Sequence, residues 1–222
     1  MCRTNLWFLC VEVLGCSQFD SNFHARMCRR HNYQAWPIRI DGSPLEYMDD
    51  AWPRGGFKTT LITVGSSIQA VLNWPEHHIL INHAVEEGAM AIGAEIRSHC
   101  ESNELLRWLF PDIFWETPKT QSRKWTQGEL TLRRRKDWKE ATFTFASSEQ
   151  PKTGGHYSII IYDDIVTEKN VMTKSGLEKI WSYWQGHQWL RDPMPLKKGD
   201  YLWYDWMPEK ADIHFRVKNV FT

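Results

Sequence analysis

The sequence predicts an α/β protein with a mostly parallel sheet that is flanked by helices. Two apolar runs, HILINHA (78–84) and YSIIIYDD (157–164), are typical of strands that are buried on both faces. Helical periodicity covers residues 59–72, 85–101 and about 173–190, between and after these runs. Strands that alternate with helices in this way form parallel sheets with crossover helices.

The residues before the first buried strand predict two helices, a loop and a weak strand. Thr4 can cap a first helix that ends at Gly15, and a second helix should cover residues 21–30. Residues 37–50 contain proline, glycine and serine, as loops do, and a short strand should end near Trp52. Acidic residues interrupt that strand and weaken its apolar pattern.

Shorter elements are expected between the two buried strands. LLRWLFPD (105–112) closes the preceding helical unit. ELTLRR (129–134) and ATFTFAS (141–147) have strand-like patterns, and a charged turn at residues 135–140 separates them. The basic residues 133–136 could contact DNA phosphates, but we favour a solvated turn.

Composition restricts the class of protein. The chain has 222 residues, enough for one sizeable domain. Lys plus Arg and Asp plus Glu both number 27, so nucleic-acid binding would need a local basic patch. No apolar run approaches the roughly 18 residues of a membrane span, so we expect no membrane association. The five cysteines form no CxxC pair, which predicts reduced thiols in a cytosolic setting. Cys28 and His31 have ligand-like spacing, but no second pair completes a zinc site.

A glycine-bearing turn, PRGGFKTT (53–60), leads into the following helix. Its spacing differs from G-x-x-x-x-G-K-[ST], because Trp52 and Phe57 occupy the two glycine positions. Its glycines would let main-chain N–H groups approach phosphate oxygens. Lys58 would then reach the β- and γ-phosphates, and the Thr59 hydroxyl would hold Mg²⁺. Taken alone, the motif is explained equally well by an ordinary turn at a helix start.

A second motif, IIIYDD (159–164), ends a buried strand in two carboxylates. Asp163 suits Mg²⁺ coordination, and Asp164 suits the orientation of an attacking water. The alternative is a strand that simply ends in a polar turn. Both motifs, in this order on a parallel sheet, favour a P-loop NTPase-type fold. We expect them to meet at neighbouring strand ends around a magnesium-bound triphosphate.

Several segments resemble the large terminase subunits of tailed bacteriophages. PRGGFKTT is similar to that family's variant Walker A motif, in which an arginine precedes the lysine by four positions, as Arg54 precedes Lys58. TGGHYSIIIYDDIVTEKN (153–170) resembles the family's Walker B segment with its acids. Further similar segments extend the resemblance over roughly residues 2–192: CRTNLWFLCVEVLG (2–15), SNFHARMC (21–28) and ELLRWLFPD (104–112).

The resemblance implies an ATPase motor that uses ATP and Mg²⁺ to drive double-stranded DNA into a preformed capsid. It implies a homo-oligomeric ring on the portal protein, with a small terminase subunit as the DNA-recognition partner. It places the protein in the cytoplasm of the infected bacterial host and not in the virion.

The resemblance also assigns roles to individual residues. It makes Asp163 and Thr59 the Mg²⁺ ligands and Asp164 the catalytic acid residue. Arg54 corresponds to a loop arginine that senses or stabilises the γ-phosphate, for which a guanidinium fork is suited. The residues expected to bind the nucleotide are Arg54, Gly55, Gly56, Phe57, Lys58, Thr59 and Thr60.

We divide the chain into a helical lead-in at residues 1–50, a P-loop ATPase core at 51–192 and an atypical C-terminal tail at 193–222. In the family, the core continues with a strand, a coupling motif and a nuclease domain. Neither the coupling motif nor the nuclease aspartates can be assigned in residues 193–222, so we expect the nuclease domain to be absent. This departure keeps one alternative open, a truncated fragment that binds DNA, portal or sibling subunits without turnover. Another P-loop translocase, such as a helicase-like enzyme, is disfavoured by the lack of helicase motifs after residue 165.

Three other features have both structural and functional explanations. His156, which follows two glycines, could sense the nucleotide state or be an ordinary loop residue. His77 and His78 should lead into a strand and not bind a metal. Three tryptophans recur along the last predicted helix, and we expect them to pack and not to stack on bases: Trp181, Trp184 and Trp189.

Overall fold

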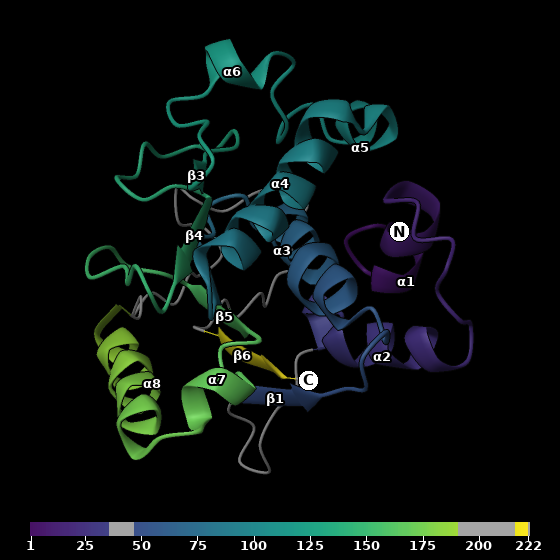
Figure 1. The fold of residues 1–222 in the computed structure, drawn as a ribbon. Helices are drawn as coiled ribbons and strands as arrows, with labels where there is room; N and C mark the ends of the chain where they lie inside the picture. Colours follow the sequence, from purple (N-terminus) through teal and green to yellow (C-terminus); the bar gives the residue numbers. More distant parts are fainter. Residues whose placement is uncertain (36–46, 191–215, 222) are drawn as a thin grey trace, which may run out of the picture.

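The computed structural model describes residues 1–35, 47–190 and 216–221. Within these ranges, a six-stranded sheet has the order β1-β6-β5-β2-β4-β3, with helices on both faces (Figure 1). Neighbouring strands are parallel except for β3 and β4. The prediction of an α/β protein with a mostly parallel sheet flanked by helices is therefore confirmed.

The two apolar runs form the centre of the sheet, as expected. Ile81 of β2 lies opposite Ile161 of β5 and Phe145 of β4. Every residue of β4 and β5 is buried, which is typical of strands with helices on both sides. The strands are β1 (Tyr47–Ala51), β2 (Ile79–His83), β3 (Glu129–Leu130), β4 (Phe143–Ser147), β5 (Ile159–Asp163) and β6 (Arg216–Phe221).

Strand β3 is shorter than the sequence predicted. Its ladder with β4 ends at Leu130, because the next backbone groups bond elsewhere. Thr131 N–H donates to the carbonyl of Lys124 at 2.9 Å, and Arg133 N–H donates to that of Ile113 at 2.9 Å. The strand predicted over residues 129–134 is thus wrong after its second residue.

Strand β1 forms despite its acidic residues because it lies at the edge of the sheet. Met48 and Asp50 point to the buried face, whereas Asp49 is exposed. The buried Asp50 carboxylate lies 3.2 Å from His31 Nε2 and 3.5 Å from Arg30 Nε, both on α2. Its charge is therefore paired, as a buried carboxylate requires.

The predicted helices are present, with local differences. Asn5, not Thr4, caps the first one, since its side chain accepts the Phe8 N–H at 3.0 Å. The single-turn helices α6 and α7 were not predicted. The helices are α1 (Leu6–Phe8), π-helical η1 (Leu9–Val13), α2 (Phe23–His31), 3-10 helical η2 (Tyr33–Ala35), π-helical η3 (Thr59–Gly65), α3 (Ser66–Asn73), α4 (Glu86–Ser102), α5 (Glu104–Leu109), α6 (Pro118–Gln121), α7 (Glu168–Val171), α8 (Lys174–Gly186) and 3-10 helical η4 (His187–Leu190).

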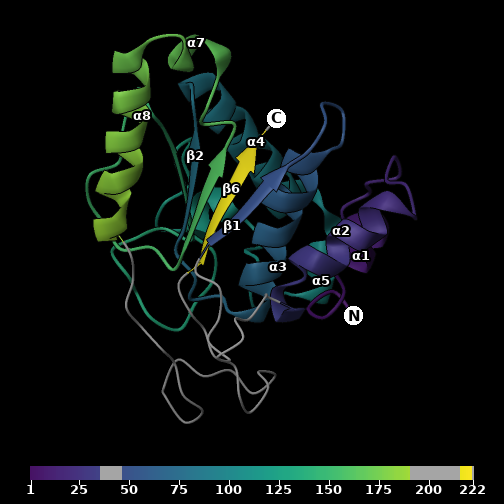
Figure 2. The ribbon, with the colours of Figure 1, turned by 90° about the horizontal axis from the view of Figure 1, so that it is seen from below.

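Two apolar clusters cover the two faces of the sheet. Alternate strand residues such as Ile81 and Ile161 join the larger cluster, together with residues of α3, α4 and the N-terminal helices. Leu80 and Ile160 point the other way and join a smaller cluster that Tyr183 of α8 partly covers. Figure 2 shows α8 on one side of the sheet and α3 with the N-terminal helices on the other.

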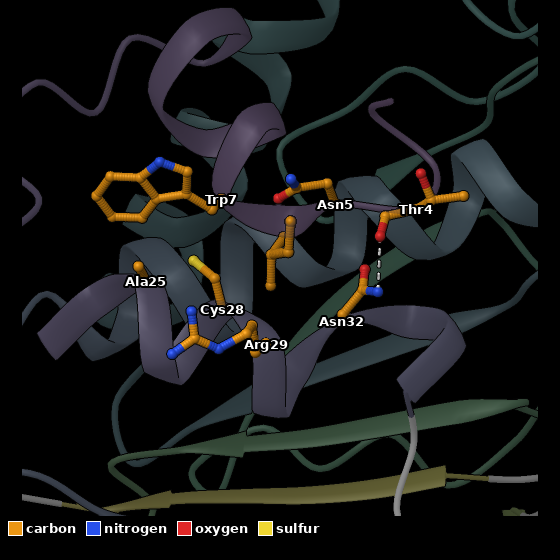
Figure 3. Close-up of a pocket in the computed structure, with 8 residues that line it drawn as sticks. Thr4, Asn5, Trp7, Ala25, Cys28, Arg29 and Asn32 are labelled. Carbon is orange, nitrogen blue, oxygen red and sulfur yellow. Dashed lines mark hydrogen bonds between the residues drawn. The ribbon is translucent and has the colours of Figure 1, made fainter. Parts of the chain in front are cut away.

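The N-terminal helices are bonded to the helix that follows the glycine-bearing turn. A Cβ atom at Gly65 would lie 2.6 Å from Cys10 Sγ, so this close approach requires glycine. Asn32 Nδ2 donates to the Thr4 carbonyl at 2.9 Å, as Figure 3 shows. Gln69 Nε2 of α3 donates to Asn32 Oδ1 at 2.7 Å and thus connects all three helices.

Strand β6 comes from the segment that the sequence analysis set apart as a tail. It lies between β1 and β5, so the boundary at residue 192 does not mark the end of the sheet. Lys218 is buried in β6, and its Nζ donates to Ser66 Oγ at 2.6 Å. The rest of residues 193–222, and residues 37–46 of the predicted loop, lie outside the described residues.

The tryptophans of α8 and η4 differ from the prediction that they pack. Trp181 is 58% exposed and Trp189 is 86% exposed. Trp184 is partly buried, with its ring 6.0 Å from that of Tyr47 and 5.3 Å from that of Trp181. Packing therefore explains Trp184 and one face of Trp181, but not Trp189.

The basic run at residues 133–136 forms a structured turn. Arg133 Nη1 donates to the Pro111 carbonyl at 3.0 Å, and Arg134 Nη2 donates to the Trp138 carbonyl at 3.1 Å. Lys136 Nζ lies 3.8 Å from the centre of the Trp138 ring. These contacts agree with the favoured interpretation of the run as a turn.

The cysteines and His77 pack inside the fold, whereas His156 is exposed and both explanations of it remain predictions. All five cysteines are buried and unpaired, as expected of reduced thiols. His77 is buried and contacts Ser158 Oγ at 2.7 Å and Tyr33 Oη at 2.9 Å. The backbone N–H of His156 donates to Glu140 at 3.3 Å. Within the described ranges, none of the helices combines the length and apolar character needed to cross a bilayer.

Two buried histidines should make the fold sensitive to acid. Burial, with Arg134 nearby, lowers the pKa of His78 to about 4, and burial lowers the pKa of His187 to about 4. In the unfolded chain these histidines take up a proton near pH 6.5, whereas in the folded chain they do so only near pH 4. The stability that the neutral histidines contribute is therefore fully present above about pH 6.5 and is lost as the pH falls toward 4. We expect each histidine to lower the free energy of unfolding by up to about 3 kcal/mol between neutral pH and pH 4. Urea denaturation at several pH values measures this loss, which His187→Phe should reduce by up to about 3 kcal/mol. An equal loss in wild type and variant would contradict the prediction for His187.

Candidate functional site

The PRGGFKTT turn connects β1 to η3 through an unusual backbone. Gly55 has φ +78° and Phe57 has φ +52°. Gly56 N–H donates to the Pro53 carbonyl at 3.2 Å, which closes the turn. A left-handed conformation is natural for Gly55 but costs about 1–2 kcal/mol for a residue such as Phe57. Strain of this kind persists where the surroundings hold the backbone, and it is frequent at functional sites.

A cavity of about 410 Å³ opens at this turn. The turn supplies most of the residues that line the cavity, and Asp164, which follows β5, supplies the rest. All the site residues predicted from the sequence line the cavity except Thr60 and Asp163. The lining residues are Pro53, Arg54, Gly55, Gly56, Phe57, Lys58, Thr59 and Asp164.

Lys58 and Asp164 form an ion pair across the cavity. Lys58 Nζ donates to Asp164 Oδ1, although the two residues are 106 positions apart in the chain. Lys58 is buried, and the Asp164 side chain is 29% exposed. Asp164 also has a positive φ of +47°, which aspartate tolerates better than most residues.

The expectation that the two motifs end neighbouring strands is wrong, because β6 lies between β1 and β5. The motifs still meet, since β1, β6 and β5 are parallel and their carboxyl ends lie at one edge of the sheet. The long side chain of Lys58 spans the distance from the turn to Asp164. In open parallel sheets, ligands bind outside the carboxyl ends of the strands.

Asp163 lies beneath the cavity and is 1% exposed. Its Oδ2 accepts the Thr63 hydroxyl at 2.7 Å, and the Thr59 hydroxyl also lies near the carboxylate. Burial raises the pKa of Asp163, against the opposing effect of these two hydroxyls. Among the described residues, its Oδ1 has no hydrogen-bond partner. A buried carboxylate oxygen without a partner is costly, and a cation would supply the missing interaction.

These residues fit the requirements of Mg²⁺ in a nucleotide site. Asp163 and Thr59 offer oxygen donors, which Mg²⁺ prefers. In the part of the chain that the structure describes, no group of three or more His, Cys, Asp or Glu side chains is placed to hold a metal ion. Mg²⁺ in phosphoryl-transfer sites takes one or two carboxylates and completes its shell with water and substrate phosphates, so a small protein ligand set suffices.

The sequence analysis missed three residues of the site. Pro53 lines the cavity, and Thr63 donates to Asp163. Thr63 could have been found, because it lies one helical turn after Thr59 and therefore on the same face. His24 of α2 contacts the turn through the Gly56 carbonyl, and nothing in its local pattern indicated this contact.

Two other cavities have fewer features of a catalytic site. One of about 800 Å³ lies between α8 and the loop at residues 148–153, on the other face of the sheet. Another of about 270 Å³ lies between α1 and α2, with Trp7, Cys28 and Arg29 around it (Figure 3). The first is larger than the cavity at the turn, but it lacks the turn's backbone strain and its buried carboxylate. We therefore place the candidate site at the turn.

No known protein-family model matches the chain, and no curated protein is similar to it at a significant level.

Proposed function

We propose that the chain is a Mg²⁺-dependent ATPase with a P-loop NTPase-type fold. The observation that carries this proposal is the contact between the two sequence motifs, in which Lys58 of the glycine-bearing turn reaches Asp164 beside the buried Asp163. A strand that merely ends in a polar turn would not need a buried acid beneath a lysine. The parallel sheet, with both motifs at its carboxyl edge, supports the same assignment.

Each residue has a defined part in the proposed hydrolysis. Lys58 leaves Asp164 and binds the β- and γ-phosphates, while the backbone N–H groups of residue 55 and residues 57–59 donate to phosphate oxygens. Asp164 then accepts a proton from the attacking water. Arg54 is exposed at the cavity and can pair with phosphate oxygens through two N–H groups. Mg²⁺, held by Asp163 and Thr59, would neutralise charge on the phosphates.

We further propose that this ATPase is part of a DNA-packaging motor of the large terminase type. Its partners would be double-stranded DNA, the portal protein, a small terminase subunit and further copies of the chain in a ring. Its place of action would be the cytoplasm of the infected bacterium. The resemblance of residues 53–60 and 153–170 to that family supports this step.

The test is phosphate release from ATP by the purified chain, with Mg²⁺ and with EDTA. We expect turnover that requires Mg²⁺. Calorimetry with a non-hydrolysable ATP analogue separates binding from catalysis. If neither binding nor turnover is found in a folded sample, the ATPase proposal is rejected.

The second candidate is a fragment that binds its partners without turnover. The sequence of residues 193–222 favours it, because the family's coupling motif cannot be assigned there. Binding of the ATP analogue without phosphate release would support this candidate over the active motor.

A further inference from the structure

His24 of α2 contacts the glycine-bearing turn and does not line the cavity. The side chain is 6% exposed. Its Nδ1 accepts the backbone N–H of Asp20 at 2.8 Å, so in the neutral ring the proton is on Nε2. Nε2 lies 3.2 Å from the Gly56 carbonyl oxygen and therefore donates to it. The backbone of the preceding turn thus sets which nitrogen of His24 is the donor.

Aromatic rings hold the imidazole in this position. Phe19 stacks on His24 at 4.7 Å between ring centres, and Phe23 meets its edge at 5.1 Å. Phe57, in the turn itself, lies 5.8 Å from His24 and 6.1 Å from Phe19. The ring that binds the Gly56 carbonyl therefore also packs against the residue whose backbone is strained.

The hydrogen bond fixes the direction of one peptide plane in the turn. In a trans peptide the C=O and the following N–H point in opposite directions. With the Gly56 carbonyl turned toward His24, the Phe57 N–H is turned away from α2. This is the arrangement in which the turn can offer N–H donors to an anion and keep its carbonyl oxygens, which would repel one, at the back.

We propose that His24 is a positioning residue for the phosphate turn. Its neutral ring, donating from Nε2, holds the Gly56–Phe57 peptide in the orientation that binds phosphate. This inference rests on the proposed nucleotide-binding function. Helix α2 is suited to the task because its end is itself bonded to Thr4 and Gln69 through Asn32.

Two substitutions separate the donor from the ring. His24→Phe keeps the aromatic packing and removes the donor, whereas His24→Gln retains an amide N–H at about the place of Nε2. We expect His24→Phe to weaken binding of a non-hydrolysable ATP analogue about tenfold, the loss typical of one hydrogen bond. His24→Gln should stay within about threefold of wild type. His187→Phe is the matched control, since His187 is buried, contacts two tyrosine rings and bonds to Tyr162 Oη at 3.0 Å on the other face of the sheet.

A second measurement reports on the turn without nucleotide. Arg54 is exposed and followed by glycine, so trypsin can cut there when the turn opens. We expect His24→Phe to speed this cut at least about fivefold and His187→Phe to leave it unchanged. An unchanged cutting rate in His24→Phe overturns the proposal, whatever the nucleotide does. A faster cut with unchanged analogue affinity overturns the role in phosphate binding. If the wild-type protein does not bind the analogue, the proposed ATPase is rejected. The rate of cleavage by trypsin then still decides whether His24 holds the turn.

Discussion

Replacing Lys58 by alanine is expected to raise the dissociation constant for Mg²⁺-ATP at least about 100-fold and to reduce hydrolysis to background. A hydrogen bond to a charged group contributes about 1.5–3 kcal/mol, and Lys58 would make such bonds to two phosphates. The loss is increased by Asp164, whose carboxylate would then face the triphosphate without the cation that it contacts now. Calorimetry with a non-hydrolysable analogue and phosphate release from ATP measure the two effects.

The control for this experiment is Lys124→Ala. Lys124 Nζ pairs with Glu129 Oε2 at 3.0 Å, away from the cavity, so its loss removes a lysine ion pair and leaves the turn intact. Its affinity for the analogue should equal that of wild type. A folded Lys58→Ala protein that binds the analogue within about threefold of wild type would contradict the assignment of Lys58 to the phosphates.

Local sequence patterns predicted the parts of the fold that depend on burial. The runs that became β2 and β5 are apolar because both faces of each strand are covered, and this pattern needs no knowledge of partners. Strand β6 was missed because its segment carries Arg216, Lys218 and Asn219, which do not read as a central strand. Lys218 is tolerated there because Ser66, from a helix more than 150 positions away in the chain, accepts a hydrogen bond from its ammonium group.

In the candidate site, too, local features could be predicted from the sequence and long-range contacts could not. Lys58, Asp163 and Asp164 could be identified because they belong to short sequence motifs. The supporting contacts could not, because they join residues far apart in the sequence. His24 meets Gly56 across 32 positions, and Thr63 meets Asp163 across 100. The exposure of Trp181 and Trp189 was missed for a similar reason, since a helical stripe of tryptophans does not say whether another layer covers it.

Replacing Asp164 by asparagine should separate affinity from turnover. Asparagine keeps the size of the side chain but cannot accept a proton from water, so hydrolysis should fall by about 10²–10⁴-fold. Affinity should be retained or rise a few-fold, because Lys58 no longer has to leave a carboxylate and the triphosphate no longer meets its charge. Single-turnover phosphate release measures the first effect, and calorimetry with the analogue measures the second.

Asp137→Asn is the matched control, because Asp137 is exposed and pairs with Arg123 at 2.6 Å far from the turn. Unchanged hydrolysis in Asp164→Asn would remove Asp164 from the catalytic role, and an affinity lowered tenfold or more would make it a binding residue. Lys58→Ala and Asp164→Asn are expected to have different effects, which a general loss of folding would not produce. Lys58→Ala should lose binding and turnover together, whereas Asp164→Asn should lose turnover while it still binds. A non-catalytic fragment would show the binding difference alone, with no turnover to lose in any variant.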